Sequence, residues 1–155
     1  TTEIYTLSLH DALPIWVDSL KWFLDWKFYG QAGLAARVEH YLALCEYAEN
    51  QVNQRDELEM VVPRESFNIC FRFRTPPSVP PAEFNRELRE RMHRASRSLV
   101  GTGVVNGELV LRLLITNVNV DTPEIDTFFQ AVIDTGQELL AERSSRNQAS
   151  PTRQA

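Results

Sequence analysis

The feature that most constrains the fold is the dipeptide Asn106-Gly107, which separates two apolar segments, Val104–Val105 and Leu109–Ile115. Two-residue hairpin turns favour this dipeptide because both of its residues tolerate positive φ angles. We therefore expect an antiparallel hairpin with a long second strand. Because side chains alternate along a strand, one of its faces should carry Leu109, Leu111, Leu113 and Ile115, and the other Val110, Arg112, Leu114 and Thr116.

The rest of the chain alternates pairs of strands with amphipathic helices. Helices are predicted from Asp18 to Phe28 (ended by Gly30), over 32–53, over 82–99 and onward from an N-cap at Thr122, with strands over 58–62 and 67–74. This order predicts an α+β fold: an antiparallel sheet of about four strands with helices on one face, preceded by two helices.

Composition and charge exclude several classes of function. The 155 residues are 43% hydrophobic and carry a net charge of −5, which argues against a general attraction to nucleic acid or anionic lipid. No apolar run approaches the roughly 20 residues that span a bilayer. The three histidines and the distant Cys45 and Cys70 show no metal-ligand spacing. Two free thiols suit a cytoplasmic protein, although a disulfide between them stays open.

The two ends of the chain differ in composition from its middle. Residues 1–15 lack the basic start and cleavage site of a signal peptide and look like a translated sequencing adapter, so we interpret them as a non-native leader. A native N-terminal arm is the alternative. Residues 144–155 are polar, and a disordered tail is expected there.

The first helix is unusually apolar around its whole circumference. Its sequence leaves almost no polar face, and such a helix expects partners on several sides. A chain of this size offers little protein to cover it, which suggests a missing partner surface. The apolar residues are Trp16, Leu20, Trp22, Phe23, Leu24, Trp26 and Phe28.

Two strand arginines are the candidate binding residues. Arg112 lies in an otherwise apolar strand, and Arg72 is out of phase with the apolar residues of its own strand. Two guanidinium groups on one sheet face could bind a carboxylate or phosphate. The alternative is that both pair with local acids or lie on a solvated face. The arginine run over 86–97 alternates with glutamates and is interpreted as a solvated helix face.

The only lysines, Lys21 and Lys27, lie on the first helix. A Schiff-base lysine needs a pocket that lowers its pKa and a cradle for the cofactor phosphate, and neither lysine has a glycine-rich loop beside it. We expect Lys21 to pair with Asp25 instead. No Ser-His-Asp or Cys-His set is present in a convincing context, so no catalytic residue is assigned.

Four segments in order resemble the end of group II pyridoxal-phosphate-dependent amino-acid decarboxylases, a family that includes glutamate and aromatic-L-amino-acid decarboxylases. They are Val17–Lys27, Gly30–Val38, Asn68–Phe73, and Leu109–Asn117 with its trailing helix. The resemblance implies the small C-terminal domain of a fold-type I enzyme, over residues 31–143, preceded at 16–30 by the end of the large domain. It also implies that the Schiff-base lysine lies upstream of Val17.

By this resemblance, the parent enzyme is a homodimer that removes the carboxylate of an L-amino acid with pyridoxal 5'-phosphate, and this chain alone is inactive. Arg112 matches an arginine near the substrate side of the small domain, and Arg72 matches more weakly; both are predicted to bind substrate. Two alternatives remain: a stand-alone α+β interaction or regulatory module, and the C-terminal domain of another fold-type I enzyme such as an aminotransferase. The identity of the amino acid does not follow from these residues.

Overall fold

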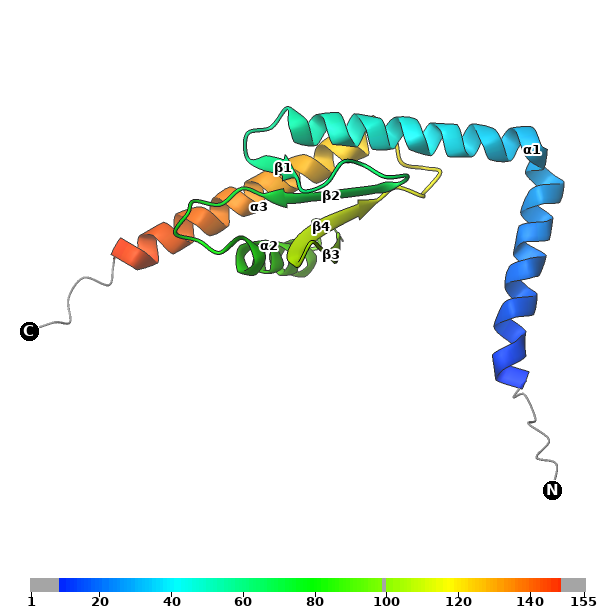
Figure 1. Ribbon diagram of the computed structural model, residues 1–155, viewed down its shortest axis with the longest axis horizontal. Coiled ribbons are helices and arrows are strands. Elements are labelled where there is room, and N and C mark those ends of the chain that lie inside the picture. Colours follow the sequence, from blue (N-terminus) through cyan, green and yellow to red (C-terminus); the bar gives the residue numbers. More distant parts are fainter. Residues whose placement is uncertain (1–8, 99, 149–155) are drawn as a thin grey trace, which may run out of the picture. The chain divides into compact units, whose positions relative to one another are not determined.

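The computed structural model describes residues 9–98 and 100–148 of the chain, which divides into two compact units, 1–40 and 41–155. Figure 1 shows the order of the elements along the chain. They are α1 (Leu9–Asn53), β1 (Leu58–Met60), β2 (Asn68–Phe73), α2 (Pro81–Arg94), β3 (Gly101–Val105), β4 (Glu108–Leu114) and α3 (Thr122–Gln148).

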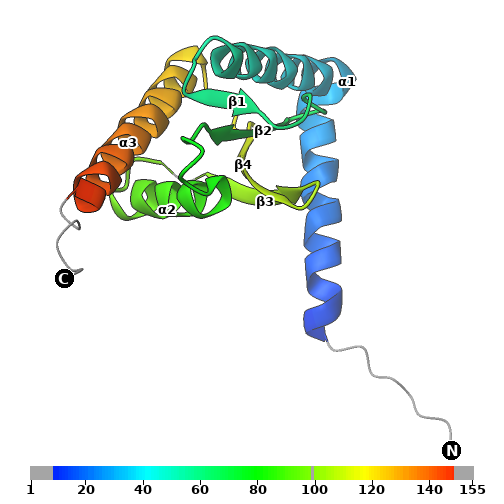
Figure 2. The same ribbon diagram turned by 60° about the vertical axis from the view of Figure 1, so that its left-hand side comes forward.

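The four strands form one antiparallel sheet in the order β1-β2-β4-β3, and Figure 2 shows α2 and α3 beside it. One face of the sheet carries the buried side chains of Ile69, Phe71, Phe73 and Leu111. The same hydrophobic core includes side chains from α2, α3 and the last turns of α1. The predicted α+β fold, with four strands and the helices on one face, is confirmed.

The two predicted N-terminal helices meet at Gly30, where the backbone leaves the helical region with φ 64° and ψ −177°. A positive φ of this kind favours glycine. Within the described part of the first unit the aromatic side chains are exposed, with Trp22 62% and Phe28 82% exposed, so the surface that the apolar pattern leads us to expect around this helix is not supplied by these residues. The prediction for Lys21 is wrong, because its ammonium pairs with Asp18, 3.2 Å away and one turn earlier, and not with Asp25.

The hairpin is confirmed by the backbone of its turn, with φ 51° at Asn106 and φ 81° at Gly107. Several helix ends differ from prediction, and α1 already begins at Leu9, before the predicted start at Asp18. Helix α2 ends at Arg94, because Ser96 adopts φ 52° and the Arg97 N–H donates to the Met92 carbonyl, which closes the helix end.

Helix α3 is capped one residue before the predicted position. Its N-cap is Asp121, whose carbonyl accepts from the Ile125 N–H and whose own N–H donates to the Glu124 carboxylate at 3.0 Å. This is half of a capping box. The helix then continues to Gln148, into the segment for which a polar tail is predicted. Residues 149–155, like residues 1–8 of the predicted leader, lie outside the described residues.

Gly136 allows α3 to approach the sheet closely. A Cβ atom at this position would lie 2.2 Å from a ring carbon of Phe73, well inside van der Waals contact. Both sides of this contact belong to the packed core, since Phe73 is buried and its ring also lies 5.4 Å from that of Phe84. Only glycine fits here without displacement of the ring.

We expect Gly136→Ala to destabilise the domain by about 1–3 kcal/mol, because forced overpacking outweighs the gain in helix propensity of about 1 kcal/mol. Urea unfolding followed by circular dichroism measures the change. In the double variant Gly136→Ala/Phe73→Leu, the smaller leucine side chain should relieve the clash and recover part of the lost stability. An unchanged midpoint for the single variant would show that the ring moves freely.

A ladder of ion pairs joins α2 to α3. Arg91 donates to both carboxylate oxygens of Glu142 at 2.7 Å, and Arg143 donates to Glu87 at 2.7 Å. Arg97 reaches Glu138 and the buried Thr135 hydroxyl. The arginine run is therefore not simply a solvated helix face, because two of its members, Arg91 and Arg97, bind acids on α3. Hydrogen bonds from Arg143 and Arg91, respectively, lower the pKa of Glu87 and of Glu142.

A carboxylate with a lowered pKa in the folded state stabilises that state above its unfolded pKa, and the stabilisation is lost as the pH falls through the folded value. We therefore expect the melting temperature to fall as the pH drops below 4.5, the ordinary value for these glutamates. Thermal unfolding at a series of pH values measures this. Glu87→Gln should flatten the profile, whereas Glu90→Gln, which removes one exposed pair within α2, should change it little.

Candidate functional site

The face of the sheet that points away from the helices carries both predicted arginines. Register places Cys70 of β2 opposite Arg112 of β4, and Arg72 lies two residues further along β2, on the same face. Val110 shares this face and is fully buried. The alternation predicted for β4 is therefore confirmed at Arg112, which lies on the face that points away from the helices. Arg72 and Arg112 share this face.

Arg72 is held by two acids from the neighbouring strands. Its Nε donates to Glu59, which is opposite it on β1, and its Nη1 donates to Glu108 of β4. The hydrogen bond to Glu59 is the main reason that the pKa of Arg72 is raised. Glu59 also lies 3.8 Å from the Nε of Arg74, so the two carboxylates are shared by two guanidinium groups. The alternative of a sheet arginine tied to local acids describes Arg72 in this structure.

Arg112 has different surroundings. It lies between Cys70 on one side and Gly101 of β3 on the other, and its side chain is exposed. Among the described residues it has no hydrogen-bond or ion-pair partner. Other described arginines bind at least one acid or carbonyl, as Arg64, Arg74, Arg89 and Arg143 do. Arg112 is thus available to bind an anion.

A groove of about 620 Å³ lies on this face beside Arg112. Its apolar lining comes from the turn before β2 and from the β3–β4 hairpin, namely Val62, Pro63, Val104, Val105 and Val110. Its other lining residues are Glu65, Asn68, Cys70, Gly103 and Arg112. The volume falls within the range of small-molecule sites.

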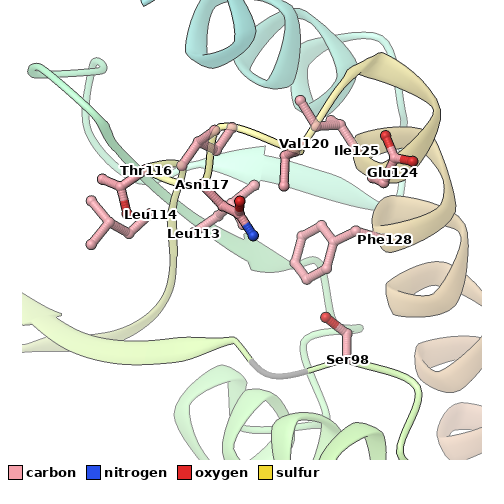
Figure 3. A pocket seen from close by; sticks show the side chains of 10 residues that line it. Ser98, Leu113, Leu114, Thr116, Asn117, Val120, Glu124, Ile125 and Phe128 are labelled. Atoms are coloured by element: carbon pink, nitrogen blue, oxygen red, sulfur yellow. The ribbon is translucent and has the colours of Figure 1, made fainter. Parts of the chain in front are cut away.

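A second, smaller recess of about 200 Å³ lies where β4 runs into α3 (Figure 3). Figure 3 shows Phe128 and Ile125 projecting from α3 toward Val120 and the end of β4. Two of its polar side chains already accept backbone hydrogen bonds: Asn117 accepts from the Asn119 N–H, and Glu124 accepts from the Asp121 N–H. This recess contributes apolar packing, and the groove beside Arg112 is the stronger candidate site.

The described residues do not form a site for pyridoxal phosphate. Lys21 lies at the surface beside Asp18, and Lys27 lies over the ring of Phe23 at 5.7 Å. Neither has a phosphate cradle. In the described ranges, no three His, Cys, Asp or Glu side chains form a metal site, and no helix is long and apolar enough to cross a membrane. Cys45 is buried, which raises the pKa of its thiol, and Cys70 is half-buried; both are free.

Sequence reasoning finds Arg112 but misses the residues that shape the groove. Gly101 and Gly103 lie on β3 opposite Arg112 and Val110, where they supply no side chains. Two glycines at alternate positions of a strand are a usable indication, because glycine weakens a strand and often marks close approach of a ligand or another backbone. The acids that neutralise Arg72 come from distant segments and follow only from the register.

The two arginines should respond differently to substitution. Arg72→Ala removes the cation that lies between Glu59 and Glu108 and leaves only the 3.8 Å contact of Glu59 with Arg74, so we expect a loss of about 1–3 kcal/mol in the free energy of unfolding. Arg112→Ala removes no described partner and should stay within about 0.5 kcal/mol of the parent. Urea unfolding of both variants measures the difference. Equal losses would contradict the assignment of Arg112 as a free cation.

No family profile matches the chain. Among curated proteins, the chain is similar to tryptophan decarboxylase 1 of Oryza sativa subsp. japonica, with 28% identity over 78% of this chain and 25% of the relative. It is also similar to cysteine sulfinic acid decarboxylase of Homo sapiens, with 26% identity over 79% of this chain and 27% of the relative.

Among solved structures, it is similar to Oryza sativa TDC with PLP and tryptamine, with a TM-score of 0.69, 27% identity, and coverage of 76% of this chain and 26% of that one. The chain therefore spans about a quarter of the length of its relatives, in their C-terminal part.

Proposed function

Because the chain is homologous to the C-terminal part of group II pyridoxal-phosphate-dependent amino-acid decarboxylases, we propose that it is the small C-terminal domain of such an enzyme. The parent protein would release carbon dioxide from an L-amino acid. The observation that carries the proposal is that the matched quarter includes an α+β domain whose open sheet face presents Arg112 without a described partner.

In this proposal residues 31–143 are the small domain and residues 16–30 are the end of the large domain. The exposed aromatic side chains of the first unit support a contact surface over 16–30, since neighbouring exposed apolar side chains mark contact sites, although the compact units themselves divide at 40/41. The large domain of the same chain would cover them. We further propose that the parent is a homodimer and that it works in the cytoplasm, which the two free thiols support.

The cofactor would be held outside these residues. Pyridoxal phosphate, when bound by the large domain, supplies an electron sink for loss of the carboxylate. The described residues hold no group that fits it, so this chain alone should neither capture the cofactor covalently nor release carbon dioxide. Its contribution would be to close over the site and to bind the substrate.

Arg112 is proposed as the contact to the substrate carboxylate. A guanidinium can bind a carboxylate through two parallel N–H···O bonds, and Arg112 has its donors free for this. Arg72 is proposed as a second, weaker contribution, since its donors already serve Glu59 and Glu108. The names of the relatives include both tryptophan and cysteine sulfinic acid, so homology leaves the substrate side chain open.

The test begins with the coding sequence upstream of Trp16, which should encode a long α/β domain containing a lysine preceded by histidine. The extended protein should release carbon dioxide from an L-amino acid when pyridoxal phosphate is added. Arg112→Ala should lower kcat/KM roughly 10- to 100-fold, because the lost hydrogen bond to a charged group contributes about 1.5–3 kcal/mol. Arg94→Ala, on the exposed side of α2, is the matched control.

Amino-group transfer without release of carbon dioxide would replace this proposal with an aminotransferase. An upstream region without such a domain would replace it with a stand-alone module.

A further inference from the structure

The groove beside Arg112 combines one free cation with an apolar lining. Of its lining residues, only Arg112 is positively charged and only Glu65 is negatively charged. Asn68 and Cys70 are neutral, and Val62, Pro63 and Val110 are apolar. A ligand that places one carboxylate on Arg112 therefore meets mainly uncharged atoms with the rest of its surface.

Gly103 of the edge strand lines the groove, and Gly101 lies two residues away on the same strand, opposite Arg112. A Cβ at Gly103 would lie 3.6 Å from Cγ2 of Val110, and a Cβ at Gly101 would lie 3.2 Å from the carbonyl oxygen of Arg112 and 3.8 Å from its Nε. Neither glycine has a positive φ, so the backbone itself does not require glycine at either position. What glycine provides here is open space on the sheet face beside Val110 and the Arg112 side chain.

The charges near the groove disfavour a second anionic group on the ligand. Glu65 lines the groove and would repel it. Arg72, the nearest cation in the strand pattern, does not line the groove and already binds Glu59 and Glu108. Arg64, beside Glu65 in the chain, is paired with Glu49 at 3.0 Å. A dicarboxylate therefore gains one ion pair at Arg112 and finds no second free cation among the lining residues.

We propose that this groove selects a monocarboxylate with an uncharged, largely apolar side chain, with Gly103 and Glu65 as its specificity-determining residues. The inference rests on the proposed role of Arg112 as a carboxylate contact and deepens it by naming the substrate class. Specificity here has an attractive part, the apolar lining, and a repulsive part, Glu65. Gly103 makes room for the side chain, and Glu65 rejects an acidic one.

The test is a titration of the ¹⁵N-labelled 155-residue chain with indole-3-propionate and with glutarate, followed through its amide resonances. Indole-3-propionate should shift the resonances of Gly103, Val110 and Arg112 and should bind about tenfold more tightly than glutarate. Arg112→Ala should abolish binding of both. Equal affinity, or tighter binding of glutarate, would overturn the selectivity.

Two groove variants test the two parts of the mechanism separately. Gly103→Val should weaken binding of indole-3-propionate about tenfold by filling the groove, with little effect on acetate. Gly103→Ala, a milder change, should act in the same direction, and the amide spectrum shows whether each variant is folded. Thr102→Val, on the neighbouring residue whose side chain points to the other face, is the matched control and should change nothing.

Glu65→Gln should strengthen glutarate binding and leave indole-3-propionate unchanged; no gain for glutarate would contradict the repulsive role. Failure of both carboxylates to bind would overturn the inference about the groove. The proposed decarboxylase function is decided separately, by carbon dioxide release from the extended protein.

Discussion

Packing of Phe71 against Phe128 and Phe129 joins the centre of the sheet to α3, and the open face depends on this contact. The ring of Phe71 lies 5.5 Å from that of Phe129 and 6.2 Å from that of Phe128, and both pairs meet edge to face. Because strand side chains alternate, burial of Phe71 in the helical layer turns Cys70 and Arg72 the other way. Arg112 of β4 pairs with Cys70 and therefore points the same way as Cys70. The contact that builds the core thus also places Arg112 on the open face.

Much of this arrangement follows from the sequence because the relevant rules are local. The Asn106-Gly107 turn has few alternatives between two strands, and the alternation around Arg112 follows from the pleat once the strand exists. The open face could therefore be predicted from the sequence. The helix boundaries are less well predicted, since the end of α2 depends on the single left-handed residue Ser96 and its backbone hydrogen bonds.

Properties that need long-range pairing do not follow from the sequence. Arg72 and Arg112 are the same residue type in similar strands, yet one binds two carboxylates and the other has no described partner. The difference arises because β1 and the start of β4 place Glu59 and Glu108 beside Arg72. Arg91 of α2 and Arg97 just after it show the same effect, since both bind glutamates on α3 that are distant in the chain.

Arg112 is left without a described partner by neighbouring residues that themselves cost stability, and this bears on its role. The chain has more acidic than basic residues, and many of its other arginines bind carboxylates. Its composition therefore does not explain why no described acid pairs with Arg112. The two positions of β3 beside it on this face, Gly101 and Gly103, instead carry no side chain at all. Glycine within a strand costs stability because it loses more backbone entropy on folding and packs nothing. A strand that is weakened where it borders an unpaired guanidinium violates local rules in the way that binding sites do. This makes a ligand carboxylate the natural partner for Arg112.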